Sequence, residues 1–163
     1  MEQKLRLPNY DYSQNGAYFI TFCTWHREHA LARVGRDDLG APAVQLTEYG
    51  QIVDRYIRSI PSAYPHVTLS NYVVMPNHVH LLLLVSADGA PESSRPTPRS
   101  TQLIPRIVGA LKRFSNRDAG FDLWQTSFHD HIIRSESDFL SVWNYISANP
   151  IRWSEDIYYD PNF

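Results

Sequence analysis

Two apolar runs separated by only two residues constrain the fold of this chain more than any other feature. Val67–Met75 and His78–Val85 are both rich in β-branched and aliphatic residues, and Pro76-Asn77 between them has the chemistry of a tight turn. The pattern predicts two antiparallel strands joined by a short connection. An antiparallel sheet is therefore the starting point for the fold.

The remaining periodic segments supply two more strands and three helices. Aromatic and β-branched residues predict strands at Ala17–Trp25 and Phe128–Arg134. Apolar residues that recur at helical spacing predict helices at 47–60, 103–116 and about 136–148.

The order along the chain is strand, helix, strand, strand, helix, strand, helix. Its first six elements follow the split β-α-β pattern of ferredoxin-like folds. The sequence therefore predicts an α+β fold, with an antiparallel sheet backed by helices and one added C-terminal helix. The length suits a single domain over 1–163. Prolines and serines concentrate at about 86–101, which predicts a mobile loop there.

Composition excludes several classes of protein. The chain is 43% hydrophobic and 20% charged, which is typical of a globular protein and not of a disordered one. Cys23 is the only cysteine, so neither a disulfide framework nor a cysteine-built zinc site can form within one chain. No run approaches the roughly 18–20 apolar residues of a membrane span, and the N-terminal residues lack the apolar core of a signal peptide. We therefore expect a cytoplasmic protein with no membrane partner.

Basic charge is concentrated in one part of a chain whose formal net charge is -2. That net charge argues against bulk coating of DNA, but the segment 95–117 contains six basic residues and no acid. Four of the six fall on a predicted helix or directly after it, largely off its apolar stripe: Arg106, Lys112, Arg113 and Arg117. They are candidate contacts to DNA phosphates, and the alternative is a solvated helix face.

The tripeptide His78-Val79-His80 lies inside a predicted strand. Because side chains alternate along a strand, both imidazoles project from one face while Val79 points to the other, into the core. Two nitrogen ligands for a metal are then presented together. The alternative is an ordinary polar strand face with two solvated histidines.

Another pair of histidines, His129 and His131, has the same spacing on the next predicted strand. This repetition weakens any argument from spacing alone. His131 is a candidate for a supporting position behind the metal ligands or for a phosphate contact, and the alternative for both is an exposed strand face.

The last predicted helix carries Tyr145 and Asn149 four residues apart, so a phenol and an amide oxygen share one helix face. Pro150 disfavours helical geometry at Asn149, which could therefore be simply the C-cap of the helix. Tyr145, one of ten tyrosines, has packing as its ordinary alternative role.

Several blocks of the sequence resemble one known family in the order and spacing of its motifs. The blocks are Leu5–Thr21, Val73–His80 with the leucines that follow, Ile107–Lys112, Trp124–Arg134 and Tyr145–Pro150. Together they cover most of the chain. They resemble the HUH single-tyrosine transposases, in particular the REP-associated tyrosine transposases and their stand-alone relatives.

The resemblance implies a role for each candidate residue. Tyr145 falls on the nucleophilic tyrosine, which makes the last helix the catalytic one, and His78, His80 and Asn149 fall on the ligands of a divalent metal. Two imidazoles and an amide oxygen suit Mg²⁺ or Mn²⁺ in function, although nitrogen ligands bind Zn²⁺ or Ni²⁺ more tightly. The implied activity is nicking and joining of single-stranded or hairpin DNA through a covalent 5′-phosphotyrosine.

Other functions stay open at this point. One is a protein that binds DNA hairpins without cutting them, and another is a metal-dependent phosphoesterase that uses water. Tyr145 in register favours the transposase, since Tyr158 and Tyr159 follow Pro150 outside the helix and lack its constraint. The resemblance fits both a homodimer and a monomer.

Overall fold

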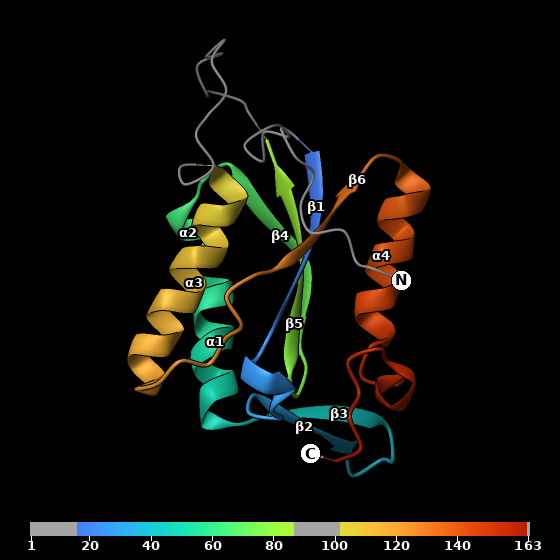
Figure 1. The fold of residues 1–163 in the computed structure, drawn as a ribbon. Coiled ribbons are helices and arrows are strands. Elements are labelled where there is room, and N and C mark those ends of the chain that lie inside the picture. Colours follow the sequence, from blue (N-terminus) through green and yellow to red (C-terminus); the bar gives the residue numbers. More distant parts are fainter. Residues whose placement is uncertain (1–15, 87–101, 163) are drawn as a thin grey trace.

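The computed structural model describes residues 16–86 and 102–162 (Figure 1). The predicted strands and helices all form, in the predicted order. In chain order the elements are β1 (Gly16–Cys23), the 3-10 helix η1 (Trp25–Arg27), β2 (Ala32–Arg36), β3 (Pro42–Leu46), α1 (Glu48–Arg58), α2 (Ile60–Ala63), β4 (Val67–Val74), β5 (His78–Val85), α3 (Leu103–Ala119), β6 (His129–Ile133), α4 (Glu136–Ala148) and the 3-10 helix η3 (Trp153–Glu155).

Four strands form the main sheet in the order β4-β5-β1-β6, and every neighbouring pair is antiparallel. This is the split β-α-β arrangement that the sequence predicts, so the predicted fold class is confirmed. Pro76-Asn77 makes the predicted turn, in which the Met75 amide donates a hydrogen bond to the His78 carbonyl (2.9 Å).

Helices α1 and α3 lie on one side of the sheet and α4 on the other (Figure 1). Strand β5 supplies alternate residues to the two faces. Val79, Leu81 and Leu83 enter the large apolar core under α1 and α3. Leu82 points to the opposite face and packs in a small apolar cluster with Val142 and Ile146 of α4. At β5, one face of the sheet is therefore apolar and the other is mixed.

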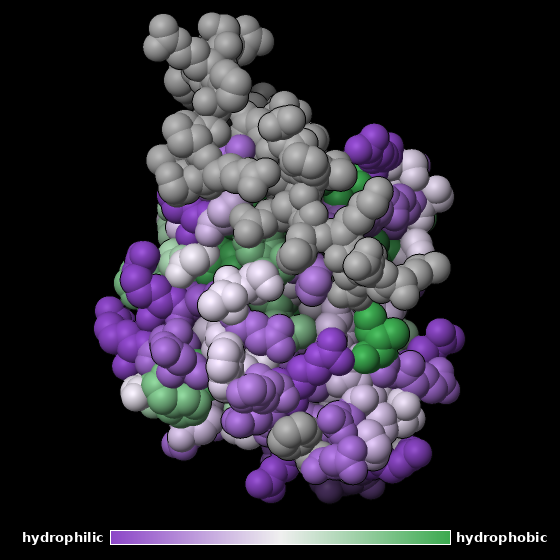
Figure 2. Space-filling view, viewed as in Figure 1, coloured by the Kyte–Doolittle hydropathy of each residue, from purple (hydrophilic) through white to green (hydrophobic). Residues whose placement is uncertain are grey.

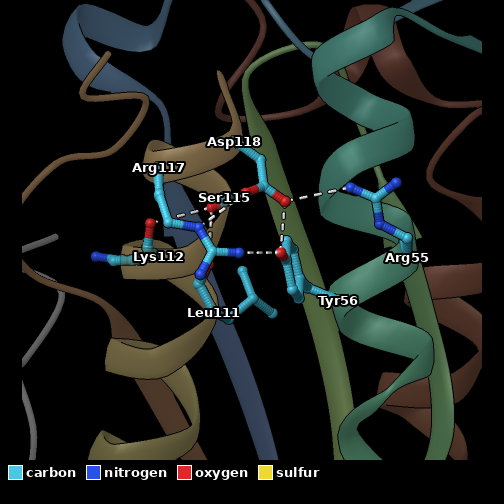
Figure 3. A network of polar contacts seen from close by, with 7 residues as sticks. All are labelled: Arg55, Tyr56, Leu111, Lys112, Ser115, Arg117 and Asp118. Atoms are coloured by element: carbon cyan, nitrogen blue, oxygen red, sulfur yellow. Dashed lines mark hydrogen bonds and ion pairs between the residues drawn. The ribbon is translucent and has the colours of Figure 1, made fainter. Parts of the chain in front are cut away.

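The α1–α3 layer is closed by apolar packing and by a polar network at its rim. Asp118 accepts hydrogen bonds from the Tyr56 hydroxyl and the Arg55 guanidinium, and Arg117 bonds both Asp118 and Tyr56 (Figure 3). Gly50 lets α1 approach the preceding chain closely, because a Cβ there would lie 1.9 Å from the Leu31 carbonyl oxygen. On the outside, hydrophilic side chains cover the margin formed by α3 (Figure 2).

Helix α4 is fixed at its start and along its length. The Ser135 hydroxyl caps it by accepting a hydrogen bond from the Asp138 amide (3.1 Å). A bulge in β4, where the register shifts between Leu69 and Asn71, directs Asn71 toward α4. The Asn71 amide donates to the Trp143 carbonyl (3.2 Å) and the Ser147 hydroxyl (3.0 Å). These bonds set the position of the helix that carries Tyr145.

The sequence prediction missed one hairpin. The sequence predicted no strand between the first strand and the helix at 47–60, whereas β2 and β3 pair on either side of a turn over 37–41, in which Asp37 accepts from two backbone amides. Gly35 and Pro42 are poor strand residues, and the hairpin stands outside the main sheet, so neither propensity nor burial signals it.

Part of what the sequence predicts falls outside the described residues. Apart from Ser86, the predicted loop at 86–101 lies outside the described residues, as do Arg95 and Arg99 and most of the N-terminal block that resembles transposases. Within the described residues, no helix combines the length and the apolar character needed to cross a bilayer.

Candidate active site

His78 and His80 lie side by side at the beginning of β5, on the face of the sheet that α4 covers. Both side chains are fully buried, and their ring centroids are 4.5 Å apart. Val79 between them belongs to the opposite core, so the alternation that the sequence predicts is observed. Neither histidine is a solvated surface residue.

The hydrogen bonds of Asn77 determine the tautomer of His78. The Asn77 amide nitrogen donates to the Tyr158 carbonyl (2.7 Å), so the Asn77 oxygen is the atom that faces Nδ1 of His78 at 2.9 Å. Because an amide oxygen only accepts, Nδ1 must carry the proton. The other ring nitrogen, Nε2, then presents a lone pair.

This lone pair faces a second acceptor. Asn149 donates its amide nitrogen to the Asp156 carboxylate (2.6 Å), which leaves the Asn149 oxygen 3.3 Å from Nε2 of His78. Two acceptors so close in a buried site repel each other unless a proton or a cation lies between them. The arrangement is therefore suited to a cation.

His80 shows the same need for a partner. Its Nδ1 is 2.6 Å from the Thr21 hydroxyl on β1, which holds the ring in place. Within the described part of the chain, its buried Nε2 has no hydrogen-bond partner. Buried polar atoms are normally paired, so an unpaired ring nitrogen beside His78 again indicates a ligand position.

Burial keeps both imidazoles neutral. It lowers the pKa of His78 to about 4, although the nearby Asp156 carboxylate opposes this shift, and it lowers the pKa of His80 well below its usual range with help from the proximity of His78. Neutral imidazoles are the form that binds metals.

Asp156 is the site residue that the sequence prediction missed. One atom each from His78, His80 and Asp156 forms a cluster in which all three potential ligand atoms lie within 4.8 Å of one another. The Asp156 backbone lies just after η3, in an irregular segment without periodicity. A carboxylate seven residues after Asn149 was visible in the sequence, but no repeat or spacing rule connected it to β5.

The donor set fits a divalent metal. Two imidazole nitrogens, the Asn149 oxygen and the Asp156 carboxylate converge, and the lone pairs of the imidazoles are directed away from their own hydrogen-bond partners. The mixture of nitrogen and oxygen ligands suits several divalent ions of the first transition row as well as Mg²⁺.

Tyr145 lies on α4 one turn before Asn149 and borders this cluster. Its ring centroid is 5.2 Å from that of His80, and its hydroxyl donates to Asp156 (3.3 Å). Burial and the negative charge of Asp156 raise the pKa of Tyr145, so the phenol is protonated at neutral pH. The side chain is 41% exposed and borders a cavity of about 470 Å³ that Asn149 and Arg152 also line. A ligand in that cavity can reach the hydroxyl.

Tyr158 is closer to the histidines than the sequence suggested. Its ring lies 4.5 Å from that of His78, and the side chain is only 4% exposed. Although it lies beyond the helix, it is therefore held firmly, as a packed wall of the site. Tyr159 is exposed and contacts Trp153 instead.

The other predicted residues lie apart from this cluster. His131 on β6 bonds Asp138 at the start of α4 (2.8 Å). Lys112 donates to two carbonyl oxygens, those of Gln125 and Ser127 (both 2.7 Å). The predicted basic residues all belong to α3, on the side of the sheet opposite α4: Arg106, Lys112, Arg113 and Arg117 (Figure 1).

Comparisons with known proteins support the resemblance read from the sequence. No family model matches the chain. An uncharacterized protein of Haemophilus influenzae is 29% identical, with coverage of 96% of this chain and 92% of that protein. A second protein of the same organism, named "Putative REP-associated tyrosine transposase", is 24% identical, with coverage of 87% and 74%.

A solved structure shares the fold. It is a REP-associated tyrosine transposase bound to a REP hairpin, with 20% identity, a TM-score of 0.62, and coverage of 92% of this chain and 74% of that one. The similarity to REP-associated tyrosine transposases is thus confirmed.

Proposed function

We propose that this chain, which is similar in sequence and fold to REP-associated tyrosine transposases, is a metal-dependent DNA endonuclease and strand transferase. It cuts one strand of hairpin-containing DNA through a covalent 5′-phosphotyrosine on Tyr145. One observation carries the proposal: the Tyr145 hydroxyl and the Asn149 amide share Asp156, beside two neutral imidazoles. Hairpin DNA is the proposed substrate because the solved relative is bound to one.

His78, His80 and Asn149, with Asp156, would hold the metal, for which we propose Mg²⁺ or Mn²⁺. When bound, a divalent cation polarises a phosphate and stabilises the negative charge that develops on it. The protein supplies rigid ligands for this purpose, since Asn77 fixes one imidazole and Thr21 the other.

The chemical step follows from the position of Tyr145. Its phenolic oxygen attacks the scissile phosphorus, a new oxygen–phosphorus bond forms, and the bond to the 3′ oxygen of the preceding nucleotide breaks. The phenolic proton leaves along the hydrogen bond to Asp156, and the departing 3′ oxygen takes a proton from solvent. Attack by the 3′-hydroxyl of another strand reverses the step and joins the two strands without ATP.

A suicide oligonucleotide tests the proposal. It carries a hairpin and a nick placed so that the cleaved fragment diffuses away, and the measurement is an SDS-stable protein–DNA adduct that requires divalent metal. Tyr145→Phe keeps the ring and removes the hydroxyl, so we expect complete loss of the adduct with stability and DNA binding nearly unchanged. Tyr159→Phe is the matched control, because Tyr159 is about as exposed, at 38% against 41%.

The same assay separates the other functions. Tight hairpin binding without cleavage would identify a binding protein, and metal-dependent cleavage without an adduct would identify a phosphoesterase. An adduct mapped to Tyr158 or Tyr159 would refute the assignment of the nucleophile.

A further inference from the structure

Directly after β1 the chain passes around the end of the sheet in η1. The Thr24 amide donates to the Asn77 carbonyl (3.0 Å), and the Trp25 amide donates to the Leu123 carbonyl (2.8 Å). Asn77 belongs to the candidate active site, whereas Leu123 follows α3 on the other side of the sheet. Helix η1 therefore connects the active site with the α3 side of the molecule.

Trp25 is an unusual residue for this position. Its large apolar side chain is 50% exposed, and its only ring contact in the described chain is with His26 (4.7 Å between centroids). An indole left half in water gains little from burial, and exposed tryptophans are common where a ligand binds.

A cavity of about 630 Å³ opens beside this tryptophan. Its volume is in the range of about 300–1,000 Å³ that is typical of small-ligand sites. One wall is firm, because the buried Trp124 donates to the Ser115 hydroxyl (2.8 Å) and Lys112 holds the carbonyls of two neighbouring residues. The lining residues are Trp25, Lys112, Asn116, Asp122, Trp124, Gln125 and Thr126.

Polar groups in this cavity are available to a ligand. In the described structure the side chains of Gln125 and Thr126 make no hydrogen bond. A flat aromatic face beside free amide and hydroxyl groups is what a nucleobase needs, because the ring stacks and its edge forms hydrogen bonds.

The backbone of η1 supports this interpretation. His26 (φ 50°) and Arg27 (φ 57°) are both left-handed, a conformation that L residues other than glycine adopt at an energetic cost. Around this turn, Trp25 lines the α3-side cavity while the Arg27 guanidinium lies 5.4 Å from the Tyr158 ring, which itself packs on His78. The short segment η1 thus places the Trp25 ring on the α3 side and the Arg27 cation on the active-site side.

We propose that the cavity beside Trp25 holds one unpaired base of single-stranded DNA next to the cut site, with Arg27 binding an intervening phosphate. The proposal rests on the proposed function, since it places the DNA strand between Tyr145 and α3. It also explains how basic residues on α3 can approach DNA that is cut on the other side of the sheet.

Equilibrium binding tests the cavity separately from the chemistry. Fluorescence anisotropy of labelled hairpins with single-stranded flanks is measured in a Tyr145→Phe background with EDTA, so that neither cleavage nor metal contributes. Each flanking nucleotide is replaced in turn by an abasic site. We expect Trp25→Ala to weaken binding roughly tenfold to hundredfold, and Trp25→Phe to restore most of the loss because it keeps a stacking ring.

The decisive result is a coupling between protein and DNA. At one flanking position, the abasic substitution should weaken binding to the parent protein but have no further effect on Trp25→Ala. Trp143→Ala is the control, since Trp143 is also exposed but lies on α4 away from η1, and we expect no change in affinity.

Two results would overturn the inference. One is unchanged affinity in Trp25→Ala, and the other is a loss that is equal at every abasic position. If the Tyr145 enzyme still forms its adduct in either case, the base pocket fails while the proposed function stands. If the adduct is absent but the coupling is present, the proposed function fails while the base pocket stands.

Discussion

The two faces of the central sheet are built from the same strands but have different roles. Under α1 and α3, alternate residues of β1 and β5 form a continuous apolar core without a buried imidazole. Under α4, the corresponding positions alternate between a small apolar cluster and buried polar groups, among them Thr21, His78 and His80. Helix α4 covers this second face, whereas α1, α2 and α3 lie on the side of the first (Figure 1).

This difference shows how a small domain can tolerate a polar site at its centre. The apolar face supplies the stability, since burial of each large aliphatic side chain contributes roughly 1.5–3 kcal/mol. The polar face can then hold neutral histidines whose Nε2 atoms accept no hydrogen bond. These atoms do not stabilise the fold unless a ligand binds them. Adjacent residues of β5 should therefore respond to substitution in opposite ways.

The largest effect should come from substituting neighbours on β5. Leu81→Ala leaves a cavity in the apolar core, and we expect the free energy of unfolding to fall by about 2–5 kcal/mol. His80→Ala should abolish metal-dependent nicking while costing less stability, because removal of the unpaired Nε2 offsets part of the loss of packing and of the hydrogen bond to Thr21. Urea denaturation and the adduct assay measure the two effects. Similar losses of stability in Leu81→Ala and His80→Ala would contradict the claim that the apolar face supplies most of the stability.

The next largest effect concerns pH. An unfolded histidine titrates near 6.5, whereas burial holds the pKa of His78 at about 4. Below pH 6.5 the unfolded chain therefore binds protons that the folded chain does not, and stability falls as the pH drops from 6.5 toward 4. Between pH 7 and pH 5, His78 alone should cost about 2 kcal/mol, and His80 acts in the same direction.

Urea denaturation at the two pH values measures this loss in the metal-free protein. A variant with both His78→Leu and His80→Leu should show a flatter pH profile. An equally steep profile in that variant would assign the loss to other groups.

A smaller effect is expected at Asp156. Asp156→Asn keeps the size of the side chain but removes the negative charge that faces Tyr145 and the Asn149 amide. We expect metal affinity, measured by calorimetry, to fall about 10- to 100-fold, as for other groups that orient metal ligands. The pKa of Tyr145 should fall as well, because Asp156 helps to raise it. The control is Asp160→Asn, and equal affinities in the two variants would exclude Asp156 from the site.

The smallest effect should separate two basic residues on α3. Arg113 is exposed and contacts Phe114, so Arg113→Ala should reduce the salt dependence of DNA binding by about one unit of slope if it contacts a phosphate. Lys112→Ala should instead lower stability, because it leaves two carbonyls without their donor. An unchanged slope in Arg113→Ala would show that Arg113 belongs to a solvated helix face and contacts no phosphate.

The parts of the fold that follow a period could be read from the sequence. The alternation in β5 predicted that Val79 enters the core and that both histidines share a face, and the helical stripe predicted α3 and α4. The position of Asn149 one turn after Tyr145 followed from the same periodicity. These features depend on local geometry, which sequence spacing determines directly.

Features that depend on tertiary packing were not predicted. Asp156 reaches the histidines only because the chain after α4 folds back onto β5, and Trp25 lies exposed in η1, beyond the end of β1, beside two left-handed residues. The β2–β3 hairpin lacks both a buried face in the sheet and strong strand residues. No period in the sequence marks any of the three.

The hydrogen bond from Asn77 to the Tyr158 carbonyl has a consequence for the order of events during synthesis. It connects the turn that orients His78 to a segment translated some eighty residues later, and Asp156 belongs to that same late segment. A nascent chain in which the sheet has emerged from the ribosome, but this segment has not, can fold its apolar face while His78 and His80 still lack Asp156. The proposed ability to cut DNA should therefore be acquired after the ability to fold.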